Sequence, residues 1–105
     1  MAVTQKTLFR GAATTTVTTT LYTAPTATST VVSNIIVTNT ASSAGTFTLS
    51  MGASGSPTSM FTTVAIAANS TTFIDLKQVL AAAEVIKGGA SAVTINFHIG
   101  GVEIA

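Results

Sequence analysis

Cysteine is absent from this chain of 105 residues, and charged residues are scarce. Without cysteine, disulfides, thiolate metal ligands and cysteine nucleophiles are excluded. Charged residues make up 7% of the chain, whereas about 25% is usual for a globular domain. The cations are dispersed and the formal net charge is +1, so we expect no nucleic-acid partner. A net charge near zero promotes association, which favours a surface packed in an assembly; an ordinary β-domain solubilised by hydroxyl groups is the alternative.

Long apolar runs are absent as well. No stretch reaches the ~18 apolar residues that a membrane-spanning helix requires. The N-terminus also lacks the apolar segment of a secretory signal. We therefore expect no membrane partner, and synthesis in a cytoplasm without export by that route.

Side chains suited to catalysis or metal binding are few. His98 is the only histidine, and no carboxylates stand near it at the spacing of a metal site. No GxSxG segment marks a hydrolase nucleophile, although counting residues leaves open a Ser–His–Asp triad assembled from distant positions. The aromatic residues Phe47, Phe73 and Phe97 fall at positions suited to a core. We expect no enzyme activity, no catalytic residue, no metal site and no cofactor.

Hydroxyl side chains take the place of charges, with 22 threonines and 10 serines. Threonine is β-branched and favours strands. Short runs of alternating apolar and polar residues are separated by turn residues at intervals of about 8–12 positions. This pattern predicts an all-β fold, a single-domain antiparallel β-sandwich of the jelly-roll kind, with about seven or eight strands. We expect at most one short helical turn, near residues 77–83. Residues 13–105 would form the sandwich, and residues 1–12 an N-terminal arm or an edge strand.

The stretch Val31–Met51 carries the clearest strand signals. Residues 46–51 alternate strictly, whereas residues 31–38 are apolar on both parities, which is typical of a central strand covered on both faces. Turn formers at 39–45 connect the two runs, so we expect a β-hairpin. Val32 and Ile36 share the second parity of the first run and would contact either the core or a neighbouring subunit.

A second well-patterned strand is expected at residues 92–99. The alternation places Val93 and Phe97 on the buried face and His98 on the exposed face. The glycine pair at 100–101 that follows predicts a bulge or a sharp bend.

Two groups of residues are candidate contacts with a partner. Lys6 and Arg10 hold half of the positive charge; they either grip an acidic neighbour or protect an edge strand from mispairing. Gly52, Gly55 and Pro57 belong to the segment richest in turn formers, which predicts the most exposed loop of the chain. A phosphate-binding loop is excluded there because no lysine follows the glycines and no helix pattern begins after them.

Several short motifs follow one another in a distinctive order. They are YTAP at 22–25, VVS at 31–33, IIVTNT at 35–40, GTFTL at 45–49, IAANST at 66–71 and GVEI at 101–104. This order resembles the small β-sandwich virion proteins of tailed bacteriophages, which are capsid decoration (cement), head-fibre or tail accessory proteins. The resemblance covers roughly residues 21–105.

The resemblance implies a structural protein of the virion, commonly a homotrimer, with the major capsid protein as its partner. We therefore expect a capsid decoration protein, made in the bacterial host cytoplasm, that binds the outer face of the head and stabilises it. One alternative is a structural subunit of the tail, neck or baseplate. Another is a glycan-binding adhesion module that would use Tyr22 and the loop at 52–59.

Overall fold

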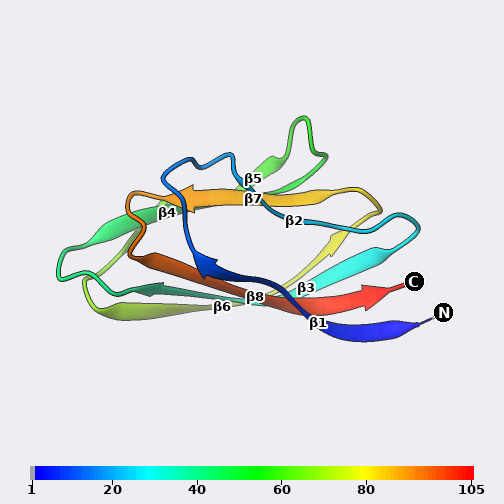
Figure 1. Ribbon diagram of the computed structural model, residues 1–105, viewed down its shortest axis with the longest axis horizontal. Coiled ribbons are helices and arrows are strands. Elements are labelled where there is room, and N and C mark those ends of the chain that lie inside the picture. Colours follow the sequence, from blue (N-terminus) through cyan, green and yellow to red (C-terminus); the bar gives the residue numbers. More distant parts are fainter. Residues whose placement is uncertain (1) are drawn as a thin grey trace.

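The computed structural model describes residues 2–105, which form two antiparallel four-stranded sheets stacked as layers (Figure 1). The strands are β1 (Val3–Ala12), β2 (Thr20–Thr23), β3 (Ser29–Asn39), β4 (Gly45–Gly52), β5 (Thr58–Ile66), β6 (Ser70–Leu80), β7 (Val85–Ala90) and β8 (Ile95–Ile104). Sheet A has the order β1-β8-β3-β6 and sheet B the order β2-β7-β4-β5. Every connection except β4–β5 crosses between the sheets, which is the jelly-roll arrangement. The predicted all-β sandwich is therefore confirmed, with eight strands.

The core lies between the two layers and is built by alternation. In β4, Phe47 and Leu49 point inward, and in β8 Ile95 and Phe97 do the same; all four are buried. The rings of Phe47 and Phe97 meet edge to face across the layers, with centroids 6.2 Å apart. Such a pair adds roughly 0.5–1.5 kcal/mol to the stabilisation from burial.

The expected hairpin between the two runs of Val31–Met51 is wrong. Strand β3 pairs with β6 and β8 in sheet A, whereas β4 pairs with β5 and β7 in sheet B. Both strands carry a strongly apolar face, and these faces meet across the core instead of lying side by side. Buried Asn39 fixes the crossing: its side chain donates to the Ser43 carbonyl at 2.9 Å and accepts from the Ala41 amide at 3.0 Å.

The central position predicted for residues 31–38 is confirmed, because β3 lies between β8 and β6. The predicted cover on both faces is not, because Val31 and Ile36 on the outer face are only partly buried. A register shift within β3 explains why apolar residues of both parities point into the core. Against β8 the register shifts between Val32 and Asn34, so Ser33 is an extra residue of β3 opposite the glycine pair. This bulge allows Val32 and Ile35 to point into the core although they lie three positions apart.

A bulge was expected in β8 at its glycine pair, Gly100 and Gly101. The extra residues lie instead in the two strands that pair with β8. Strand β1 shifts register between Thr7 and Phe9, and β3 shifts at Ser33, both opposite the glycines of β8. A Cβ atom on Gly101 would stand 2.3 Å from the Val31 carbonyl oxygen, so only glycine permits this approach of β8 to β3.

One smaller expectation also differs from the structure. Val93 is 63% exposed, because it lies in the turn before β8 and not in the strand. The predicted limit of at most one helical turn near residues 77–83 agrees with the structure, in which residues 77–80 continue β6 and a turn follows.

The N-terminal residues form part of the sandwich. Strand β1 pairs along β8 at the edge of sheet A, and its Leu8 side chain is buried in the core. Residues 3–12 are thus placed as an edge strand, and Met1 lies outside the described residues.

Candidate functional site

The described residues present two broad outer surfaces, one on each sheet. Among residues 2–105 no three histidine, aspartate or glutamate side chains gather at a distance suited to a metal ion. No helix in this part of the chain could cross a membrane. The outer faces of the two sheets are therefore the main candidates for function.

The outer face of sheet B is lined by hydroxyl groups. Its outward residues on β4 are Thr46, Thr48 and Ser50, because Phe47 and Leu49 point inward. A threonine-rich segment, residues 14–19, lies over β7: the Ala90 amide donates to the Thr14 carbonyl at 2.9 Å, and the Gly88 amide donates to the Thr19 carbonyl at 2.9 Å. This face is polar, and Lys87, the partner of outward-facing Ser50, adds a positive charge to it.

The outer face of sheet A carries both apolar and polar side chains. The register places side chains in rows that cross all four strands. One outward row is Gln5, Val102, Val31 and Val79. Another is Arg10, His98, Ile36 and Phe73, and one outward row lies between the two. We call the apolar members of this surface the apolar face; they are Val3, Val31, Ile36, Phe73, Val79, Val102 and Ile104. Phe73 is 76% exposed, Val79 67% and Val3 64%, and the others are partly buried.

Phe73 shows what the sequence interpretation missed. It was expected in the core, but β6 alternates so that Ile74 and Leu76 pack inward while Phe73 and Asp75 point outward. The alternation of residues 72–76 contained this signal. The large size of an aromatic residue therefore did not determine its side of the sheet.

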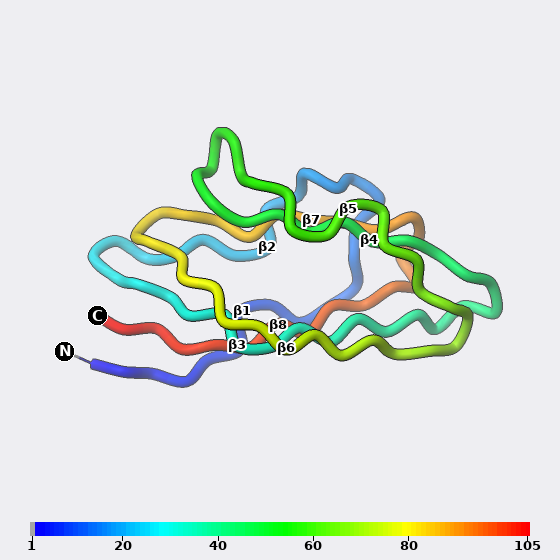
Figure 2. Tube along the Cα trace, turned by 180° about the vertical axis from the view of Figure 1, so that it is seen from behind, coloured from blue at the N-terminus to red at the C-terminus, as the bar shows by residue number. Residues whose placement is uncertain are grey.

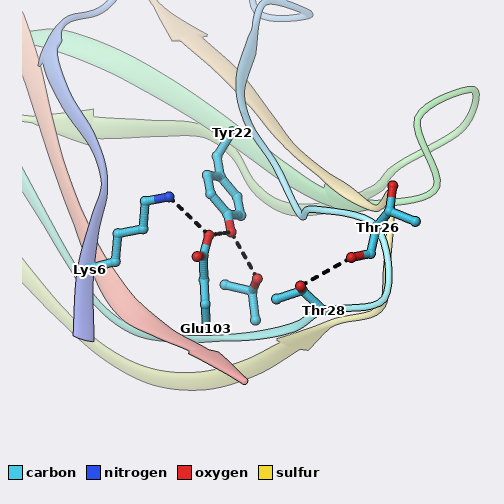
Figure 3. A network of polar contacts seen from close by, with 6 residues as sticks. Lys6, Tyr22, Thr26, Thr28 and Glu103 are labelled. Carbon is cyan, nitrogen blue, oxygen red and sulfur yellow. Dashed lines mark hydrogen bonds and ion pairs between the residues drawn. The ribbon is translucent and has the colours of Figure 1, made fainter. Parts of the chain in front are cut away.

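A polar cluster joins the two sheets at one end of the sandwich (Figure 3). Tyr22 of β2 donates to Glu103 Oε2 of β8 at 2.5 Å, and its hydroxyl lies 2.9 Å from Thr30 Oγ1 of β3. Lys6 Nζ of β1 donates to the same Glu103 oxygen at 3.2 Å. Beside the cluster, Thr28 Oγ1 donates to the Thr26 carbonyl and closes the turn before β3.

This cluster perturbs the two acidic groups in opposite directions. Burial raises the pKa of Tyr22 to about 12, and its hydrogen bond to Glu103 acts in the same sense. The hydrogen bond from Tyr22 lowers the pKa of Glu103; burial opposes this, and Lys6 reinforces it. Both shifts favour the arrangement of a neutral phenol beside a carboxylate. Because Tyr22 is buried, it offers no stacking platform to a sugar.

The residues singled out from the sequence lie in different environments. Lys6 pairs with Glu103, whereas Arg10 is exposed on the outer face of sheet A. Val32 is fully buried within a single chain, and Ile36 is half-buried on the apolar face. They do not form one site.

The loop at residues 53–57 is the most prominent projection of the molecule. It connects β4 and β5 and rises from sheet B on the side away from sheet A (Figures 1 and 2). Lys87 Nζ holds its base by donating to the Ser54 carbonyl at 2.9 Å. Gly55 is at the open tip, where an added Cβ atom would meet nothing within 4 Å.

Comparison with known proteins gives a likeness of fold. No protein-family model and no curated protein sequence matches this chain. Among solved structures, the chain is similar to one from the T13 IBDV viral particle, with a TM-score of 0.59 and 12% identity over 97% of this chain. It is also similar to one from the infectious bursal disease virus Gx strain, with a TM-score of 0.53 and 15% identity over 97% of this chain.

The likeness covers only part of those viral chains. This chain spans 30% of the first and 32% of the second. A pentameric capsid protein from metagenomic phage sequences also matches, at 10% identity over 96% of this chain and 59% of that one, but its TM-score of 0.34 is too low to support an argument. The fold is therefore one that chains of virus particles also adopt.

Proposed function

We propose that this protein is a capsid decoration, or cement, protein of a tailed bacteriophage, located in the virion and bound to the outer face of the head. The observation that carries the proposal is the projecting and unobstructed loop at 53–57 on a nearly uncharged jelly roll (Figures 1 and 2). Exposed loops held on a rigid scaffold often make the contacts of a protein with its partners. The jelly-roll fold common to chains of virus particles and the sequence resemblance support a contact within a virion.

The partner in this proposal is the major capsid protein. A shell presents many equivalent sites, so contacts that are individually weak can together hold its subunits in place. We assign the shell contact to the loop at 53–57, because it projects furthest from the sandwich and its tip is unobstructed. The trimer implied by the sequence resemblance stays a prediction that competes with a dimer, and the mass of the purified protein distinguishes the two.

The test uses purified protein and capsids that lack it. Wild-type protein should co-sediment with the capsids to saturation and should raise the temperature at which they release their contents. Gly55→Arg places a long charged side chain at the open tip of the loop and should weaken binding by about tenfold, the size expected for one disrupted contact. The control is Ser42→Arg, at an exposed position in the connector between β3 and β4.

Each outcome has a distinct meaning. Binding by both variants at the wild-type level would show that the loop is not the shell contact. Failure of wild-type protein to bind capsids would contradict the decoration role. Density at the tail, neck or baseplate alone, in cryo-electron microscopy of intact particles, would favour a structural subunit of those parts.

A further inference from the structure

The outer face of sheet A is uncovered in the single chain. Both views of the molecule show no described segment crossing it, whereas residues 14–19 and the 53–57 loop lie on the side of sheet B (Figures 1 and 2). Its strands contain 10 or 11 residues. At about 3.3 Å per residue and about 4.8 Å between strands, four such strands cover roughly 600 Å².

This area fits pairing with a second copy. Two such faces in contact would bury about 1,200 Å², which is the lower end of the range for specific protein interfaces. Aligned sheets pack face to face about 10 Å apart, as the two layers of a sandwich do. The same surface on both partners makes the contact isologous, and two-fold dimers are the commonest closed assemblies.

The face also carries a projection and a hollow that suit each other. Phe73 on β6 is the most exposed large apolar side chain described. Across the sheet, Thr7, Arg10, Asn34, Ile36, His98 and Gly100 line a hollow of about 260 Å³. It lies over β1, β8 and β3, where Gly100 has no side chain to fill it.

We propose that the outer faces of sheet A of two copies pack together about a two-fold axis that runs parallel to the strands, between β8 and β3. That axis lays β6 of the second copy over β1. It sets Phe73 of the second copy at the hollow beside Arg10, and it sets Val102 against Val31 of the second copy. The aromatic projection of each copy thus fills the hollow of the other.

The charges on the face are complementary under the same axis. Arg10 stands on β1 at one edge, and Asp75 stands on β6 at the other edge. Asp75 lies in the row next to that of Arg10, so Asp75 of the second copy comes within the reach of the arginine side chain. Two such pairs would form, one near each edge of the contact.

The test is the mass of the purified protein over a range of concentrations, by sedimentation equilibrium, with no capsid present. We expect a monomer–dimer equilibrium. Val79→Asp puts a charge on the face and should raise the dimer Kd by about tenfold or more. Val93→Asp is the matched control, because Val93 is 63% exposed against 67% for Val79 but lies off the face in a turn. It should leave the Kd unchanged.

A charge exchange tests the orientation. Arg10→Asp and Asp75→Arg should each weaken the dimer, and the double variant should recover much of the loss, because the pair is then restored with reversed sign. A monomer at all concentrations, a trimer, or equal effects of Val79→Asp and Val93→Asp would overturn the proposal. A double variant no tighter than either single variant would overturn the two-fold arrangement. Since no capsid is used, failure here is distinct from failure of the decoration role.

Discussion

Replacing Gly101 by alanine should strongly destabilise the protein. The added Cβ atom would stand 2.3 Å from the Val31 carbonyl oxygen and 3.0 Å from Leu8 Cδ1. The first neighbour is backbone of a paired central strand and cannot turn away, so β8 and β3 must separate and weaken their hydrogen bonds. Overpacking of a core costs about 1–3 kcal/mol, and we expect the upper end of that range because backbone must move.

The assay is urea unfolding followed by circular dichroism. With a slope of about 1–3 kcal/mol/M, a loss of about 3 kcal/mol lowers the midpoint by roughly 1–3 M. Gly55→Ala is the control, since nothing lies within 4 Å of its added Cβ atom, and its midpoint should match the wild type. If Gly101→Ala unfolds at the same urea concentration as Gly55→Ala, the close approach of β8 to β3 is not a constraint and the reasoning is refuted.

Two further predictions concern buried polar groups. Stability should fall as pH drops below about 4.5, because the pKa of Glu103 is lowered in the folded state, and again as pH rises from about 10 towards 12, because the pKa of Tyr22 is raised to about 12. Tyr22→Phe should flatten both arms of the melting temperature plotted against pH; unchanged arms would show that the cluster does not link folding to protons. Asn39→Ala should cost about 1–3 kcal/mol in urea unfolding, because it leaves the Ala41 amide and the Ser43 carbonyl without their side-chain partner; a midpoint equal to that of the wild type would contradict this.

The β-sandwich could be predicted because period-two alternation survives in the strands that build the core. Residues 46–51 and 95–99 each have one apolar and one polar parity, and both lie in the structure with the apolar parity buried. The pairing of strands could not be predicted in the same way. Alternation predicts that a strand has an apolar face. It does not indicate whether the next strand pairs beside that strand or packs against it across the core. The hairpin predicted at Val31–Met51 failed for this reason: the two strands pack across the core and do not pair.

The outer face of sheet A was harder to predict, because amino-acid composition describes the whole surface and the outer faces of the two sheets differ. Threonine and serine suggested hydroxyl surfaces throughout, and the outer face of sheet B has that character. The outer face of sheet A does not, and its recognition needs the register across four strands. Phe73 and Val79 belong to one strand, while Val31 and Val102 come from its neighbours. Lys6 and Arg10 look equivalent in sequence, yet only Arg10 is on the outer face, because the bulge at Leu8 shifts the register of β1 between them.

The two proposed contacts use opposite sides of the molecule, and this makes them compatible. The apolar face belongs to sheet A, and the 53–57 loop rises from sheet B on the side away from it (Figure 1). A pair joined through sheet A would therefore carry two loops that point in opposite directions from its centre. Only one of these loops can face a given shell surface, so the pair would bind a shell through one copy and present the other copy outward. Low charge suits this arrangement, since copies that must associate with each other and with a shell gain from weak mutual repulsion.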